Sequence, residues 1–280
     1  MQIDLKKIPC FGVAGNFTGH LEQAGEDKDF ASMKTSDANA PKALFPTYIP
    51  GEKNGIVPDF LREFPFDADR IIYPEGENKL QIESECAIIC NLEWKDGKVS
   101  SIKPVLFGAS NDCSIRREGA KKISLKKNWG KSSKGLSNHL IPIDSFSSGG
   151  ILDHYRIASF LVRNGKAAEY GEDSAVKNYS YIYGRLLTWI VEKLNFQKNE
   201  GPAEDVGSYL RASGCPEKIM VSIGATRYTE FGRTVFLQNG DASVVVLYPE
   251  TYSAGKIASL VAAKDFTDPT ISVLYQQCVV

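Results

Sequence analysis

This sequence has few histidines and no excess of either sign of charge. The first feature limits the metals that it could bind, and the second limits its partners. Only three of the 280 residues are histidine, and none stands at ligand spacing from a cysteine, so zinc is a poor candidate for a bound metal. The net charge is −1, and no basic run extends beyond the lysines at 126–127 and 131–134. We therefore expect neither nucleic acid nor an anionic membrane as a partner.

Long apolar runs and paired cysteines are also lacking. The longest apolar runs, such as residues 244–248, have the length of a strand, and residues 1–6 do not have the layout of a signal peptide. The six cysteines are scattered through apolar segments without CxxC pairs, which is typical of reduced thiols in a core. We expect a soluble, cytoplasmic protein.

The patterning indicates one domain of mixed, mainly β structure. A chain of 280 residues, 42% of them hydrophobic, suits one large core better than two small ones. Asp96-Gly97 predicts a hairpin turn, and the prolines of residues 41–75 predict extended segments and turns. A long helix at about 175–194 is expected from the apolar stripe Tyr179, Ile182, Tyr183, Leu186, Ile190 and Leu194.

Two glutamates, Glu83 and Glu85, share one face of a predicted strand. The surrounding residues 79–90 are rich in β-branched and small side chains, so the two carboxylates lie roughly 7 Å apart and point the same way. Because like charges repel, either this face is solvated or a hard cation with oxygen ligands lies between them. Asp112 ends the next apolar run, 104–110, and brings a third carboxylate to a strand end.

An ordered set of sequence blocks resembles the fumarylacetoacetate hydrolase family. That family carries a block with a histidine, then Glu-x-Glu on a strand, then Asn-Asp-x-Ser-x-Arg, then Gly-Lys-Ser. The matching blocks here are residues 14–25, 83–85, 111–116 and 130–132, with weaker matches at 160–166 and 221–226. The resemblance covers about residues 10–232.

The resemblance implies an α+β fold, a mixed β-sheet roll with one long helix, in a single catalytic domain that forms a homodimer. Within it we expect a lid and entry segment at about 10–45, a metal-binding β core at 75–250 and a C-terminal extension at 251–280.

The resemblance also implies a site for Mg²⁺, or for Mn²⁺ or Ca²⁺, and a set of residues around it. A 2-oxo acid would chelate the ion through its 2-oxo oxygen and its carboxylate. The implied metal ligands are Glu83, Glu85 and Asp112. The implied catalytic residues are His20 as the base that activates water, its lid neighbours Glu22 and Gln23, and Lys131 beside the developing charge. The residues expected near the substrate are Arg116, Gly224 and Thr226.

Two of the departures from the family pattern concern the expected lid and the expected substrate turn. Gln23 stands where hydrolytic members place a glutamate, with a carboxylate one position earlier at Glu22, and Ala225 alters a Thr-Gly-Thr-Pro turn. A glutamine can orient an imidazole but cannot stabilise its charged form.

The leading expectation is a metal-dependent hydrolase or lyase that cleaves a carbon–carbon bond in a small 2-oxo or β-diketo acid, such as an acylpyruvate or oxaloacetate. An isomerase of the 2-hydroxymuconate type is one alternative, because it needs no attacking water. A non-catalytic scaffold that binds a metal and a 2-oxo acid is the other.

Overall fold

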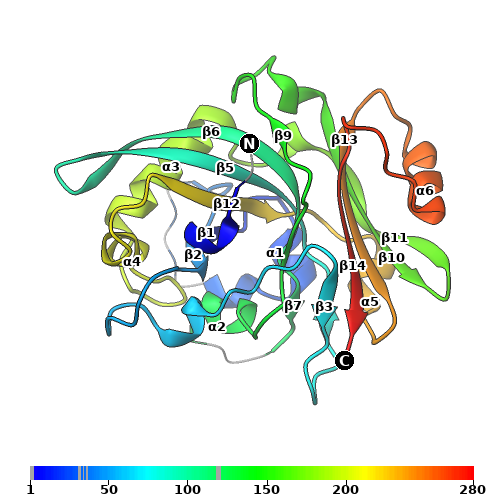
Figure 1. The fold of residues 1–280 in the computed structure, drawn as a ribbon, viewed down its shortest axis with the longest axis horizontal. Helices are drawn as coiled ribbons and strands as arrows, with labels where there is room; N and C mark the ends of the chain where they lie inside the picture. Colours follow the sequence, from blue (N-terminus) through cyan, green and yellow to red (C-terminus); the bar gives the residue numbers. More distant parts are fainter. Residues whose placement is uncertain (1–2, 31–32, 34, 36, 118–120) are drawn as a thin grey trace.

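The structure is a computed structural model that describes residues 3–30, 33, 35, 37–117 and 121–280. Within these ranges the chain forms two large sheets and one short two-stranded sheet (Figure 1). Strands predominate over helices, so the expectation of an α+β, mainly β fold is confirmed.

The larger sheet curls around the core and carries most of the candidate site. Its strands are, in spatial order, β2 (Ala43–Tyr48), β1 (Cys10–Ala14), β12 (Lys218–Ala225), β5 (Ser84–Lys95), β6 (Lys98–Asn111) and β8 (Gly135–Leu136), with β9 (Ile141–Pro142) also pairing with β6. The strands β5 and β6 form the expected hairpin. Its turn residues Asp96 and Gly97 both have positive φ, 51° and 71°, as a two-residue turn of the favoured hand requires.

The smaller sheet packs beside the larger one and includes the C-terminal strand (Figure 1). Its strands are, in spatial order, β11 (Lys166–Ala175), β10 (Tyr155–Arg163), β13 (Ala242–Pro249), β14 (Ser272–Val279) and β3 (Arg70–Ile72), and the two-stranded sheet pairs β4 (Leu80–Gln81) with β7 (Ser114–Ile115). Asn111 at the end of β6 joins the two large sheets, because its amide nitrogen donates to Ser243 and Gln276 at 3.1 Å each.

In the described ranges α3 is the longest helix, with 14 residues, and the other helices are shorter. The α-helices are α1 (His20–Ala24), α2 (Ile123–Lys127), α3 (Tyr183–Phe196), α4 (Val206–Ala212), α5 (Glu230–Thr234) and α6 (Ala254–Ala263), and the 3-10 turns are η1 (Leu5–Lys7), η2 (Asp27–Phe30), η3 (Asp59–Arg62), η4 (Ile151–His154) and η5 (Val176–Asn178). Figure 1 shows α6 on the outer side of the smaller sheet. None of the helices in the described ranges combines the length and apolar character needed to span a bilayer.

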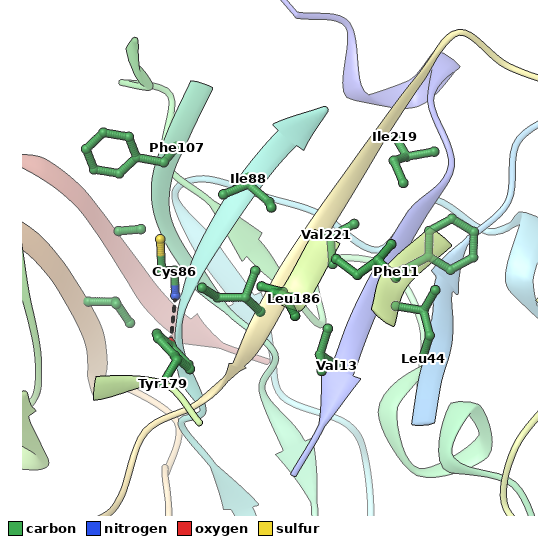
Figure 2. Packing of buried hydrophobic residues seen from close by; sticks show 14 of the residues in the cluster. Phe11, Val13, Leu44, Cys86, Ile88, Phe107, Tyr179, Leu186, Ile219 and Val221 are labelled. Atoms are coloured by element: carbon green, nitrogen blue, oxygen red, sulfur yellow. Dashed lines mark hydrogen bonds between the residues drawn. The ribbon is translucent and has the colours of Figure 1, made fainter. Parts of the chain in front are cut away.

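The main core lies between the larger sheet and α3. Leu186 of α3 shares one buried cluster with Phe11 and Val13 of β1 and with Val221 of β12 (Figure 2). The alternation expected along β5 is present: one face packs in this cluster, and the opposite face, with Ala87 and Ile89, packs in a second one. All six cysteines are free, and five of them are buried.

One expected boundary differs from the structure, and two expected segments contain strands of the large sheets. The long helix begins at Tyr183 rather than near 175, because β11 continues to Ala175 and Tyr179 lies in the connection, where its hydroxyl accepts from the backbone N–H of Cys86 at 3.3 Å (Figure 2). The expected lid at 10–45 contains the buried strand β1 and the start of β2. Within the expected C-terminal extension, β14 pairs with both β13 and β3, so this segment is part of the main fold.

Candidate metal centre

Glu83, Glu85 and Asp112 meet at one end of the β5–β6 hairpin. Each offers a carboxylate oxygen, and these oxygens lie within 4.8 Å of one another. The pairing of Ser84 with Asn111 sets the register between the two strands. Beyond this pair, the backbone N–H of Asp112 donates to the backbone oxygen of Glu83 at 3.1 Å. All three side chains are buried, with at most 3% of the residue exposed. The three carboxylates, which the sequence places at the ends of two strands, therefore form one buried acidic cluster.

Glu85 is held by a bulge in the neighbouring strand. The register between β12 and β5 shifts between Ser222 and Ala225, where Gly224 has a φ of +117°. The backbone N–H of Gly224 donates to Glu85 Oε2 at 3.1 Å. A side chain at Gly224 would also meet Asn16 Cβ at 3.0 Å, so both φ and space favour glycine. Gly224, expected near the substrate, therefore lies against the carboxylate of Glu85.

Basic side chains neutralise two of the three carboxylates. The ammonium of Lys127 forms an ion pair with Glu83 and lies 3.2 Å from Asp112 Oδ2, and the ammonium of Lys134 pairs with Asp112 Oδ1. Glu83 Oε1 lies 2.8 Å from Arg116 Nη2. Burial raises the pKa of Glu83, but the charges of Lys127 and Arg116 outweigh it and hold that pKa below its usual range.

Glu85 stands in a different electrostatic position. Burial raises the pKa of Glu85, and the charges of Asp112 and Glu83 raise it further. Glu85 forms no ion pair with a described basic residue, so the cluster has one carboxylate without its own counter-charge. A divalent cation prefers oxygen ligands and would supply that charge, so the three residues fit a hard ion such as Mg²⁺ or Mn²⁺.

Arg116 is mostly buried, and its guanidinium contacts four side chains around the cluster. Its guanidinium donates to Gln81 Oε1 at 2.6 Å, to Glu26 Oε1 at 2.7 Å and to the hydroxyl of Tyr228 at 2.8 Å, in addition to its contact with Glu83. The guanidinium is thus engaged on every side by protein groups. Arg116, expected near the substrate, contacts the metal-ligand candidate Glu83 in this structure.

His20 is buried beside the cluster at the start of α1. Its Nδ1 lies 2.8 Å from the backbone oxygen of Thr226. Because a carbonyl only accepts, Nδ1 carries the proton and Nε2 is left with the lone pair when the ring is neutral. Burial lowers the pKa of His20, although the charge of Glu83 opposes this effect. A neutral imidazole is the form that accepts a proton.

The segment from Gly15 to Glu26, here called the lid segment, closes over the cluster. The described hydrogen bonds of the Gln23 side chain go to the backbone of Tyr228: Nε2 donates to the carbonyl oxygen at 3.2 Å, and Oε1 accepts from the N–H at 2.8 Å. Gly19 and Gly25 flank α1 with φ of 84° and 69°. Glu22 is exposed on the outer face of α1 and does not reach the cluster. Gln23 therefore docks the lid segment, and the backbone of Thr226 orients His20.

Two more expected site residues have other places in the structure. Lys131 is exposed and lies outside the cluster, which takes its lysines from Lys127 and Lys134. The hydroxyl of Thr226 lies 2.9 Å from that of Ser84, so it is engaged within the protein. Lys131 was selected because it follows Gly130 in the family block, but its chain segment directs it to solvent.

The sequence analysis did not single out Lys127, Lys134, Glu26 or Tyr228 as site residues. Lys126-Lys127 follows the apolar Ile123-Ser124-Leu125, and both lysines are buried on the short helix α2. A lysine pair in an apolar segment is the available signal, since buried lysines require acidic partners.

A small cavity of about 20 Å³ lies against His20, Glu83, Glu85 and Lys127. It has room for about one water molecule or ion. Small-molecule pockets are typically an order of magnitude larger, so a 2-oxo acid needs the lid segment or Lys127 to move. A larger surface cavity of about 590 Å³ lies near Trp189 and Phe196, and the acidic cluster is not part of it.

Three solved structures with a similar fold are informative: one protein assigned to an enzyme family, one dehydratase and one isomerase. A protein from Yersinia pestis CO92 assigned to the fumarylacetoacetate hydrolase family is 13% identical, with 99% of this chain and 95% of that chain covered and a TM-score of 0.51. A 2-keto-3-deoxy-D-arabinonate dehydratase, solved with magnesium and 2,5-dioxopentanoate, is 12% identical over 97% of this chain and 72% of that chain, with a TM-score of 0.55. A 5-carboxymethyl-2-hydroxymuconate delta-isomerase from Mycobacterium smegmatis is 14% identical over 97% and 78%, with a TM-score of 0.51. The resemblance to the fumarylacetoacetate hydrolase family is therefore confirmed for the fold.

No curated protein sequence matches the chain. One family model matches most of it, residues 26–278, which include all three carboxylates and the three buried lysines Lys126, Lys127 and Lys134. The chain belongs to that family, the family of unknown function DUF5718.

Proposed function

We propose that this protein is a divalent-metal-dependent enzyme that cleaves a carbon–carbon bond in a small 2-oxo or β-diketo acid, by hydrolysis or decarboxylation. One observation carries the proposal: three buried carboxylates lie within 4.8 Å of one another, and two of them, Glu83 and Glu85, line a small cavity together with His20, a histidine whose pKa is lowered. Solved structures of similar fold, one of them with magnesium and a dioxo acid bound, support this reading.

In this proposal Glu83, Glu85 and Asp112 hold Mg²⁺, or Mn²⁺ or Ca²⁺. When bound, such an ion supplies Lewis-acid chemistry, withdrawing electrons from the 2-oxo carbonyl of the substrate. Arg116 keeps Glu83 in position, and the N–H of Gly224 does the same for Glu85.

His20 acts as the proton acceptor. Its Nδ1–H is fixed on the oxygen of Thr226, so Nε2 is the atom that takes a proton from water or from the substrate carbon. The Gln23 departure does not remove this function, because the orienting group is a backbone carbonyl. The lid segment then excludes bulk water once it is docked through Gln23.

The test is turnover of a substrate panel by the full chain with Mg²⁺ or Mn²⁺. Acylpyruvates are followed by loss of diketo absorbance and oxaloacetate by loss of its enol absorbance. We expect turnover that a chelator abolishes and added metal restores, and that Glu85→Gln loses. Full activity of Glu85→Gln in the presence of chelator would contradict the proposal.

An isomerase of the 2-hydroxymuconate type remains the second enzyme candidate. The observation in its favour is His20 itself, since moving a proton between carbons needs a base and no attacking water. Ketonisation of a dienol, followed by ultraviolet absorbance, separates it from carbon–carbon cleavage.

A non-catalytic scaffold is favoured by a different observation, the Lys127 ammonium within the acidic cluster. Binding of oxalate without turnover across the panel would support that reading, and turnover that depends on His20 would end it. A homodimer and a cytoplasmic location stay predictions from the resemblance and the composition, and light scattering tests the dimer.

A further inference from the structure

The ammonium of Lys127 contacts carboxylate oxygens that a bound metal ion would use as ligands. Its ammonium pairs with Glu83 Oε2 and lies 3.2 Å from Asp112 Oδ2, so it bridges two of the three carboxylates. Its side chain also lines the small cavity beside Glu85. Lys127 and a divalent cation therefore compete for the same two carboxylates.

Among the basic groups that pair with the cluster, the ammonium of Lys127 is the one that can move away from the carboxylates. Lys134 also pairs with Asp112, but it is 1% exposed and does not line the cavity. Arg116 is held by four different partners. Lys127 borders the open space and has a flexible stem, so its ammonium can swing away without breaking other described contacts between side chains, apart from its 5.8 Å approach to the ring of Phe45.

Although Glu85 has no ion-pair partner among the described residues, acidic and basic groups near the cluster are equal in number there. Four described carboxylates, those of Glu26, Glu83, Glu85 and Asp112, lie near four described basic groups, those of Arg116, Lys126, Lys127 and Lys134. A divalent cation brings two positive charges into this buried space. Uncompensated charge is costly there, because the surroundings screen it poorly.

We propose, on the basis of the proposed function, that the metal ion displaces the Lys127 ammonium and enters together with a dianionic ligand, so that ion and dianion bind cooperatively. Two negative charges on the ligand cancel those that the ion adds, and the displaced ammonium is free to pair with the ligand carboxylate. A 2-oxo dicarboxylate, or a diketo acid in its enolate form, meets this requirement. A monoanion such as pyruvate does not.

Calorimetric titration of Mn²⁺ into chelator-treated full-length protein tests this inference. The titration is run alone, with oxalate and with oxamate, and free Mn²⁺ is corrected for its complexes with each anion. Oxalate is a dianion and oxamate is the matched monoanion. The variants are Lys127→Met, which removes the ammonium at similar volume, and the control Lys131→Met, which removes an exposed ammonium from the same part of the chain.

We expect oxalate to tighten Mn²⁺ binding to the wild type about tenfold or more, the size of a typical coupling between two ligands, and oxamate to do so much less. Lys127→Met should bind Mn²⁺ alone about tenfold more tightly than the wild type, with less gain from oxalate. Lys131→Met should match the wild type.

Two outcomes would overturn the inference while leaving the proposed function intact. One is tight Mn²⁺ binding to the wild type that neither anion improves, and the other is an equal response to oxalate and oxamate. Both are measured on the wild type, so they hold even if Lys127→Met does not fold, and Lys127→Gln then provides the second variant. Absence of Mn²⁺ binding in every protein, with or without oxalate, would instead contradict the proposed function.

Discussion

The imidazole of His20 and the backbone oxygen of Thr226 form a buried hydrogen bond of 2.8 Å that fixes which ring nitrogen can accept a proton. His20→Asn keeps a donor near the position of Nδ1 and removes the basic nitrogen. We expect kcat to fall about 10²- to 10⁴-fold, the usual contribution of a general base, while Mn²⁺ affinity in the presence of oxalate stays the same. Steady-state kinetics and calorimetry on the same preparation check this pair of outcomes.

The pH dependence of the wild type follows from the same residue. The pKa of His20 is lowered from 6.5, mainly by burial, so the ring is neutral at pH 7 and protonates only at lower pH. We expect kcat/KM to be level between pH 7 and 8 and to fall on an acidic limb whose midpoint lies below 6.5. A midpoint above that value would show that His20 is not the group that must be neutral.

Gln23 holds the lid segment closed through two hydrogen bonds to the backbone of Tyr228. Each bond contributes about 0.5–1.5 kcal/mol, so Gln23→Ala should favour opening by about 1–3 kcal/mol. Amide hydrogen exchange in residues 15–26 should then become roughly 5- to 150-fold faster. Glu22→Ala is the control, since Glu22 lies on the exposed side of the same helix and should leave exchange unchanged.

Arg116 and Arg117 offer a matched pair of substitutions. Arg116 contacts Glu83 and Glu26 in the interior, whereas Arg117 pairs with Glu77 near the surface. We expect Arg116→Gln to weaken Mn²⁺ binding about 10- to 100-fold, as loss of a group that orients a metal ligand does. Arg117→Gln should have no measurable effect. Equal affinities in the two variants would show that Arg116 does not position Glu83.

Glu204 gives a stability prediction away from the metal centre. It is 3% exposed, and burial raises its pKa from 4.5 to about 7, against weaker opposing effects of Ser124 and Lys122. The folded state therefore retains a proton that the unfolded state loses above pH 4.5, so wild-type stability should fall as the pH rises from about 4.5 to 7.

The measurement is urea denaturation of the wild type and Glu204→Gln at pH 5 and pH 8. The stability of the wild type relative to Glu204→Gln should decrease by about 1–3 kcal/mol between these pH values. Glu200→Gln, a substitution at an exposed neighbour, should show no such difference from the wild type. A relative stability that rises with pH would have the wrong sign for a buried, protonated Glu204.

Strand periodicity and the family resemblance together predicted the acidic cluster. Glu83 and Glu85 were placed on one face because side chains alternate along a strand, and Asp112 was placed at the end of the next strand-like run. The resemblance implied that the three share one metal ion. Local patterns of this kind fix which way a side chain points. The hairpin turn at Asp96-Gly97 and the strand around residues 244–248 were predictable for the same reason.

The basic partners were not predictable, because they depend on tertiary contacts. Lys127 meets Glu83 across 44 residues of sequence, and nothing within α2 shows which carboxylate its ammonium reaches. Lys131 was chosen from a short motif and is exposed, whereas Lys134, three residues later, is buried and pairs with Asp112. The start of α3 was also missed, since the buried Tyr179 continues the helical stripe although it belongs to the preceding connection.

Anomalous diffraction from crystals grown with Mn²⁺ and oxalate tests the central claim most directly. We predict one strong peak about 2.0–2.3 Å from an oxygen of each of Glu83, Glu85 and Asp112, with oxalate on its open side and the Lys127 ammonium moved away from Asp112. A map in which the three carboxylates carry no peak, and Lys127 still bridges Glu83 and Asp112 at saturating Mn²⁺ and oxalate, would contradict it.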